Sequence, residues 1–117
     1  FEIPVTDFDR AKKFYMSIYD YEMPETMVGP VRMGFFLYEQ KEHRVGGAIV
    51  GGTGRAPSQD GTLPYLNGGM DLNIVLNRIE KAGGKVIQPK TFIGDSLGYV
   101  AHFIDTEGNK IVLHSRK

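Results

Sequence analysis

Short runs of apolar residues follow one another along the chain, and the clearest pair lies near the C-terminus. Residues 98–104 and 111–114 are rich in the β-branched and aromatic residues that strands favour. Between them stands Asp-Thr-Glu-Gly-Asn (105–109), whose acidic, amide and glycine residues are typical of a tight turn. The pattern predicts a β-hairpin from Gly98 to His114. Because it is so apolar, we expect the rest of the chain to pack on it.

Two stretches show the spacing of three and four residues that is typical of an amphipathic helix. The first follows a short strand at residues 1–5, and Asp7 is placed to cap its N-terminus before it ends near Asp20. Its apolar face consists of Phe8, Ala11, Tyr15 and Ile18. The second has the apolar face Leu72, Val75, Leu76, Ile79 and Ala82. We expect it to stop at Gly83 and Gly84, since glycine readily adopts the left-handed conformation.

The other apolar runs predict the remaining strands. We expect these strands at residues 21–28, 31–39, 45–50, 64–67 and 85–88. A charged turn at 40–43 and a loop at 89–97 separate some of them. The segment 52–63 is rich in Gly, Ser and Pro, so we interpret it as a linker between two halves.

The two halves repeat one order of elements. Asp71 lies 64 residues after Asp7, and at that offset Phe8 falls on Leu72, Ala11 on Val75, Gly34 on Gly98, Phe36 on Val100 and Ala48 on Val112. We therefore predict one domain over 1–117, made of two βαβββ units at about 1–51 and 64–117. The fold class is α+β. Each unit would lay one helix on a curved, mostly antiparallel sheet, and the opposite, concave faces would form a cleft.

Composition limits the function classes. Fourteen Lys and Arg residues balance fourteen Asp and Glu, which argues against nucleic acid or an anionic membrane as partner. There is no cysteine, so disulfides, thiolate zinc sites and thiol nucleophiles are excluded, and we expect a cytoplasmic location. No apolar run approaches the ~20 residues of a membrane span, and no signal peptide is visible. The sequence begins at Phe1 inside an expected strand, so we expect the native start to lie upstream.

Three segments carry a family resemblance. Phe-Glu-Ile-Pro-Val-Thr-Asp-Phe-Asp-Arg-Ala-Lys-Lys-Phe-Tyr (1–15), Ala-Gly-Gly-Lys-Val (82–86) and Phe-Ile-Asp-Thr-Glu-Gly-Asn (103–109) stand in this order. They resemble the opening strand and helix, the end of the second helix, and the final hairpin of the vicinal oxygen chelate superfamily. That superfamily is the glyoxalase, bleomycin-resistance and extradiol dioxygenase group. The residues of these segments are most similar to those of the small glyoxalase-like proteins in that superfamily. The resemblance implies the duplicated βαβββ fold and a homodimer.

The resemblance also locates a metal site. Metal-dependent members hold a divalent ion with His, Glu or Gln from the first, fourth, fifth and eighth strands, where the ion acts as a Lewis acid. The matching positions here are Val112, Ala48 and Pro64, with Tyr65 next to Pro64, while the first-strand position falls before Phe1. Neither alkyl side chain nor proline ligates a metal. We therefore predict no metal and no other cofactor.

The remaining candidates are two histidines and a tyrosine. His114 stands two residues after Val112, so the two share one face of a strand, and His102 lies in the paired strand. With Tyr65 they are candidate catalytic groups, although ordinary half-exposed strand histidines would look the same. The residues expected to line the cleft are Ala48, Tyr65, His102, Val112 and His114.

Two functions fit these observations. The first is metal-free binding of a small molecule in the cleft between the sheets, in the manner of bleomycin-resistance proteins. The second is an enzyme, either a glyoxalase-like lyase or isomerase or a dioxygenase relative, in which His102, His114 or Tyr65 would supply the base and the electrophile. Asp105 and Glu107 resemble a catalytic carboxylate pair, but we interpret them as turn residues.

Overall fold

A computed structural model describes residues 1–37, 46–52 and 54–117. In chain order its elements are β1 (Glu2–Pro4), α1 (Phe8–Tyr19), β2 (Glu25–Val28), β3 (Val31–Phe35), β4 (Ala48–Gly51), β5 (Tyr65–Asn67), α2 (Asn73–Ile79), β6 (Lys85–Gly94), β7 (Gly98–Ile104) and β8 (Lys110–Ser115). The turn predicted at 40–43 lies outside the described residues, as do the predicted strand ends at 38–39 and 45. In the described part, neither helix is long and apolar enough to cross a membrane.

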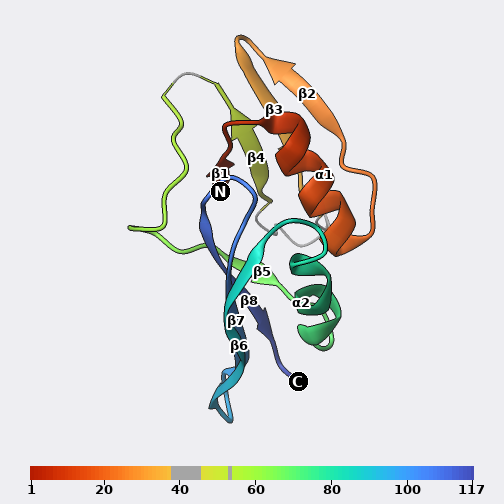
Figure 1. The fold of residues 1–117 in the computed structure, drawn as a ribbon, viewed down its shortest axis with the longest axis vertical. Helices are drawn as coiled ribbons and strands as arrows, with labels where there is room; N and C mark the ends of the chain where they lie inside the picture. Colours follow the sequence, from red (N-terminus) through yellow and green to blue (C-terminus); the bar gives the residue numbers. More distant parts are fainter. Residues whose placement is uncertain (38–45, 53) are drawn as a thin grey trace.

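The strands form two four-stranded sheets, ordered β1-β4-β3-β2 and β5-β8-β7-β6. We call them the first and the second sheet. In each, one pair is parallel (β1 with β4, β5 with β8) and the other neighbours are antiparallel. Figure 1 shows one sheet beyond the other along the long axis, with α1 and α2 on the same side. The predicted α+β class and the two βαβββ units are confirmed, although hydrogen bonds do not join the strands into a single sheet.

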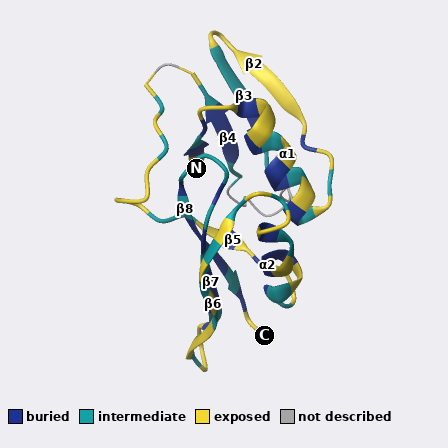
Figure 2. Cartoon of the chain, viewed as in Figure 1, coloured by how far each residue is buried: buried dark blue, intermediate teal, exposed yellow. Residues whose placement is uncertain are grey.

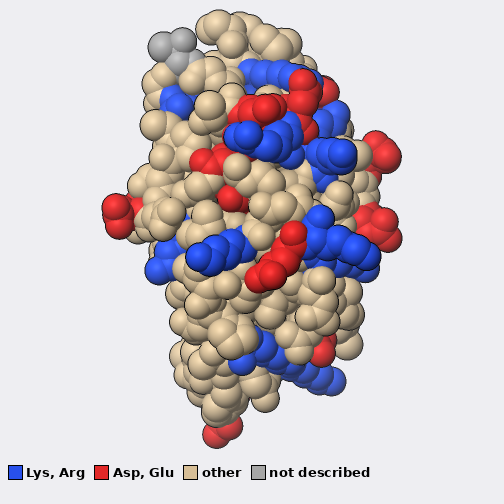
Figure 3. Space-filling view, in the orientation of Figure 1, with Lys and Arg blue, Asp and Glu red and all other residues tan. Residues whose placement is uncertain are grey.

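The helices and one face of each sheet enclose a common hydrophobic core. The predicted helix face is buried, and its neighbour Phe14 joins it. Phe14 and Tyr15 of α1 contact Phe103 and Phe36 through their rings, so residues of both halves meet in one cluster. Figure 2 shows the buried residues along the inside of both sheets, whereas β2 is exposed along its length. On the face in Figure 3, acidic and basic side chains lie beside one another.

Strand β6 is longer than predicted. It continues through Pro89 to Gly94, where the sequence suggested a loop from 89 to 97. β6 is an edge strand, so the missing N–H of Pro89 interrupts hydrogen bonds on one side at most. The pairing with β7 also shifts register between Gln88 and Thr91, an irregularity that accommodates the proline.

Several other elements are shorter than predicted, among them β2 and α2. β2 begins at Glu25, because Asp20 leaves α1 in the left-handed conformation and Pro24 follows shortly after. α2 ends at Ile79, short of the apolar stripe that reaches Ala82. The helix therefore stops before the two glycines, which instead complete the turn after it: the N–H of Gly84 donates to the Ile79 carbonyl, and Gly83 has a φ of 107°.

The register shows that no single offset relates the halves. Ile49 pairs with Gly34, whereas its counterpart Leu113 pairs with Ala101. The predicted match of Gly34 with Gly98, and with it that of Phe36 with Val100, is therefore wrong. The physical reason is that the connection between β3 and β4 is longer than the tight turn between β7 and β8, which shifts one strand along its neighbour.

Candidate functional site at the junction of the two sheets

The second sheet has one face against the core and one face away from the helices. Directly paired residues point to the same face of a sheet. Leu113 and Ala101 belong to the core, so the residues that alternate with them point away from it. The strand register therefore defines an open face, made of Tyr65 and Asn67 (β5), Lys110, Val112 and His114 (β8), Val100, His102 and Ile104 (β7), and Lys85, Gln88 and Thr91 (β6).

The register brings three predicted site residues into one row. Tyr65 pairs with Val112, and Val112 pairs with His102. His114 lies in the next row, beside Asn67. Ala48 belongs to the first sheet instead, where it pairs with Glu2 and Phe35. Four of the five expected cleft residues thus share the open face, and the fifth lies on the other sheet.

Exposure separates these residues further. Val112 is 0% exposed and Ala48 3%, whereas Tyr65 is 58% exposed. His102 and His114 are half-buried. A ligand approaching from solvent therefore meets Tyr65 and the histidines before it meets either aliphatic side chain.

A pocket of about 380 Å³ lies where β1 meets β5 and the start of β8. Its lining includes Phe1, Glu2 and Pro4 from the first sheet, Tyr65 and Lys110 from the second, and Asp60 from the segment between the halves. Its size falls in the range of small-molecule sites. Of the predicted site residues only Tyr65 lines it. Lys110 was missed, although its spacing of two residues from Val112 placed it on the same face.

A second, more open hollow of about 570 Å³ lies at the other end of β5. Tyr65 and His114 line it, together with Leu97 and Ile93 from the β6–β7 hairpin and Arg116. Tyr65 therefore contributes to the walls of both hollows. The ring Nε2 of His114 lies 2.5 Å from the Leu97 carbonyl oxygen, so Nε2 donates and carries the proton.

The other histidine is held neutral. Burial lowers the pKa of His102, and the positive charge of Lys110 lowers it further. At pH 7 its ring is therefore an uncharged hydrogen-bonding group on the open face.

The donor set does not fit a divalent metal. In the first sheet the register pairs Glu2 with Ala48. Arg55 already holds the Glu2 carboxylate, with Nε 3.3 Å from Oε1. Ala48 and Val112 offer no donor atoms. In the described residues no three His, Cys, Asp or Glu side chains gather where they could hold an ion.

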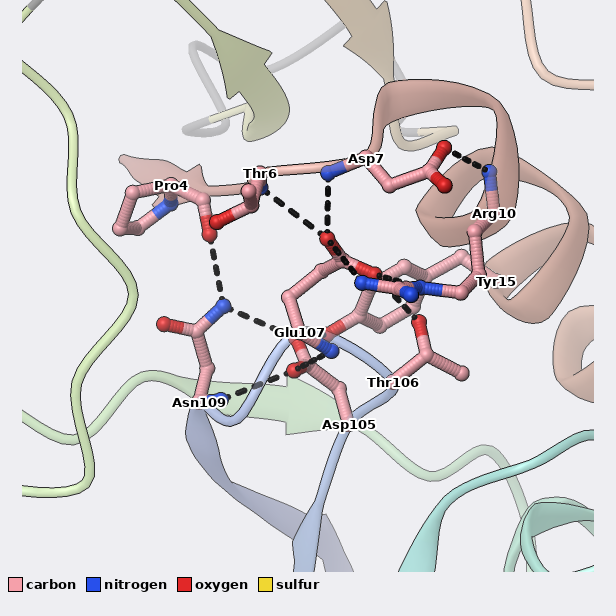
Figure 4. A network of polar contacts seen from close by, with 9 residues as sticks. All are labelled: Pro4, Thr6, Asp7, Arg10, Tyr15, Asp105, Thr106, Glu107 and Asn109. Atoms are coloured by element: carbon pink, nitrogen blue, oxygen red, sulfur yellow. Dashed lines mark hydrogen bonds and ion pairs between the residues drawn. The ribbon is translucent and has the colours of Figure 1, made fainter.

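Asp105 and Glu107 have the structural role that the sequence suggested. Asp105 Oδ1 accepts hydrogen bonds from the backbone N–H groups of Glu107 and Asn109, which closes the β7–β8 turn. Glu107 reaches further, because its carboxylate accepts the backbone N–H of Thr6 (3.0 Å) and Asp7 (2.6 Å) at the start of α1. Figure 4 shows this turn of the second half joined to the first half.

Protonation of Glu107 should weaken the fold. Its side chain is fully buried, and burial alone would raise its pKa. Hydrogen bonds from Arg10, the Asp7 N–H and Thr106 outweigh burial, so the pKa of Glu107 is lowered. A lowered folded-state pKa stabilises the protein above the unfolded value of about 4.3, and this stabilisation is lost as pH falls through the folded value.

We therefore expect the free energy of unfolding to decline below about pH 5 with a steeper slope in the wild type than in Glu107→Gln. At pH 7 that variant should lose roughly 1–3 kcal/mol. Its amide oxygen can still accept the N–H groups of Thr6 and Asp7, but its NH₂ donor then faces Arg10 Nε, and the charge that pairs with Arg10 is lost. Urea denaturation between pH 3 and pH 7 measures both. Glu22→Gln, at an exposed position, is the control. Parallel pH profiles for the wild type and Glu107→Gln would contradict the assignment.

Comparison with known proteins supports the architecture. No family model and no curated protein matches the sequence. Among solved structures, a glyoxalase I variant from Zea mays matches with a TM-score of 0.74 and 18% identity, over 98% of this chain and 45% of that chain. A glyoxylase/bleomycin resistance protein/dioxygenase domain from Frankia sp. EAN1pec matches with a TM-score of 0.72 and 12% identity, over 100% of this chain and 94% of that chain.

A third similar structure is that of an antibiotic binding protein. TnmS3, an antibiotic binding protein from Streptomyces sp. CB03234, matches with a TM-score of 0.66 and 21% identity, over 100% of this chain and 93% of that chain. This chain thus spans less than half of the maize enzyme but nearly the full length of the two bacterial proteins. The chain has the fold shared by glyoxalase I and the glyoxalase, bleomycin resistance and dioxygenase domains.

Proposed function

We propose that this protein binds a small organic molecule, without a divalent metal, in the pocket between β1 and β5. The observation that carries the proposal is the pocket of about 380 Å³ at the sheet junction, beside family metal positions that hold Ala48 and Val112. A cavity of this size whose neighbouring metal positions lack donor atoms suits binding better than Lewis-acid catalysis.

The pocket lining supports the proposal. Phe1 and Tyr65 offer aromatic surface and Pro4 adds aliphatic surface, while Lys110 and Asp60 are polar groups that can orient a ligand. Pockets of small-molecule binders combine apolar walls with a few polar groups in this way. The antibiotic-binding TnmS3 has the same fold, so the fold accommodates this kind of function.

Removal of the Tyr65 ring is expected to weaken binding roughly tenfold, because stacking and burial of an aromatic ring contribute on the order of 1–2 kcal/mol. A panel of polycyclic aromatic antibiotics, screened by isothermal titration calorimetry against wild type and Tyr65→Ala, measures this. Ile74→Ala removes an equally exposed apolar side chain from α2 and is the control. Equal affinities of all three proteins for every binder would place the site elsewhere.

A metal assay tests the other half of the proposal. Purified protein dialysed against Ni²⁺, Zn²⁺, Fe²⁺ or Mn²⁺ and then against metal-free buffer should retain far less than one ion per chain by mass spectrometry. It should also fail to isomerise the hemithioacetal of methylglyoxal and glutathione. A stoichiometric ion that survives dialysis, or that isomerisation, would favour the enzyme.

We further propose that the chain forms a homodimer. The tip of the β6–β7 hairpin exposes Phe92 (54%), Ile93 (40%) and Leu97 (55%), and Figure 2 shows it projecting from the body of the molecule. Contiguous exposed apolar side chains of this kind mark association surfaces. Sedimentation equilibrium of wild type and Phe92→Ser should show a dimer that the substitution weakens.

A further inference from the structure

The open face of the second sheet is positively charged. It carries Lys85 and Lys110 in one row, on either side of Ile104, and His102 and His114 in the rows beyond. Strands lie about 4.8 Å apart, so the two lysine Cα atoms are roughly 10 Å from each other. Among the strand residues that point to this face, all of them described, none is Asp or Glu.

Of the two lysines, only Lys110 lines the pocket, and it has no counterion among the described residues. Its ammonium group makes no hydrogen bond or ion pair with a described residue. Two lysines elsewhere are paired, since Lys90 lies 2.8 Å from Asp71 and Lys12 lies 2.9 Å from Glu25. An ammonium group at a pocket that has no acidic partner among the described residues favours an incoming anion.

The acids near the pocket do not satisfy Lys110. Arg55 holds the carboxylate of Glu2. Asp60 is exposed, and among the described contacts no ion pair joins it to Lys110. Tyr65, on the strand beside Lys110, makes no hydrogen bond within the described part of the protein, so its ring and hydroxyl are also available. The pocket is thus lined by a cation and an aromatic ring, neither of which has a hydrogen-bond or ion-pair partner among the residues that the structure describes.

We propose that the ligand is an aromatic organic anion, such as an aryl carboxylate, whose acid group pairs with Lys110 and whose ring packs on Tyr65. This inference rests on the proposed function and narrows it, since it names the class of molecule that the pocket takes. Lys110 is then the residue that determines specificity. Asp60, at the rim, disfavours a second acid group on the part of the ligand nearest to it.

Three compounds of similar size test the charge: 1-naphthoate, 1-naphthalenemethanol and 1-naphthylmethylammonium. We expect 1-naphthoate to bind five- to tenfold more tightly than the alcohol, and the ammonium compound to bind most weakly. Only the affinity for 1-naphthoate should fall with added NaCl, because salt screens the charge pair. Chemical-shift titration of ¹⁵N-labelled protein gives the affinities and shows whether Tyr65 and Lys110 are perturbed.

Substitution assigns the effect to one side chain. Lys110→Met keeps the length of the side chain and removes its charge, so it should reduce the affinity for 1-naphthoate to that for the alcohol. The affinity for the alcohol should fall much less, because the alcohol loses at most one hydrogen bond and no charge pair. Lys81→Met, at an exposed position just beyond α2, is the matched control. In the wild type, bound 1-naphthoate should also raise the pKa of His102, because it neutralises the charge that lowers it.

The outcomes are distinguishable. Equal affinities for all three compounds, with chemical-shift changes at Tyr65 and Lys110, would overturn the proposal that the ligand is an anion. The proposed small-molecule site would still stand. Tighter binding of the ammonium compound would have the same consequences and would point to Asp60. If no compound perturbs the open face, both proposals fail. Should Lys110→Met not fold, the salt dependence of binding to the wild type still distinguishes a ligand that binds as an anion from one that binds as a neutral molecule or as a cation.

Discussion

Replacement of Asp105 by alanine is expected to lower the free energy of unfolding by roughly 3–5 kcal/mol, more than most single substitutions. Asp105 is 4% exposed, and its carboxylate accepts four hydrogen bonds. The donors are the hydroxyl of Tyr15 (2.7 Å), the N–H of Glu107 (2.9 Å), and the N–H (2.9 Å) and side-chain amide (3.0 Å) of Asn109. Alanine would leave these buried donors without acceptors, and each unsatisfied group costs about 1–3 kcal/mol.

Part of this loss is specific to the contact between the two halves. Tyr15 comes from α1 and is fully buried, so its bond to Asp105 joins the first half to the β7–β8 turn (Figure 4). Tyr15→Phe removes that bond alone and should cost roughly 1–2 kcal/mol. Asp95→Ala, at an exposed turn, should change stability by less than about 0.5 kcal/mol. Urea denaturation followed by circular dichroism measures the free energy of unfolding of all three variants. A loss below 1 kcal/mol for Asp105→Ala would contradict its role as a buried acceptor.

Gly98→Ala should be similarly damaging, at roughly 3 kcal/mol. Gly98 begins β7 with a φ of 87°, a conformation that alanine adopts only with strain. A Cβ at this position would also meet the carbonyl oxygen of Ser115 and lie 2.9 Å from the Cα of Arg116. Both obstacles are backbone atoms of β8 and the residue after it, so the end of the strand would have to move.

Gly61→Ala separates strain from crowding. Gly61 has a φ of 90°, but nothing lies within 4 Å of a Cβ built there. It should therefore lose only the roughly 1 kcal/mol that the backbone conformation costs. Thermal and urea denaturation of the two variants give the comparison. Equal losses would show that the close approach of Ser115 to Gly98 does not matter.

Local patterns in the sequence predicted most elements. The hairpin from Gly98 to His114 is β7, a turn and β8, because strand formers on either side of Asp-Thr-Glu-Gly-Asn specify it without help from distant residues. The face Phe8, Ala11, Tyr15 and Ile18 is buried, since helical spacing fixes which side of α1 is apolar. Gly83 and Gly84 form the turn after α2, because glycine readily adopts the left-handed conformation that such a turn requires.

The predictions that were wrong concern how strands are ordered and paired with one another. β6 runs through Pro89 because it lies at an edge, and only the order of strands in the sheet shows that. Gly34 corresponds to Ala101 and not to Gly98, because the connections within the two sheets differ in length. The same kind of register information puts Glu2 beside Ala48 and Tyr65 beside Val112. None of these pairings has a signature within one segment.

Most elements and the duplicated α+β fold follow from the amino-acid sequence, because side-chain chemistry and short-range periodicity suffice for each. The tertiary structure alone decided which side chains share a surface. It placed Lys110 and Tyr65 on one pocket with Phe1 and Glu2 of the other sheet. That placement depends on strand register and on how two edges meet, where a shift of one residue turns every side chain to the opposite face.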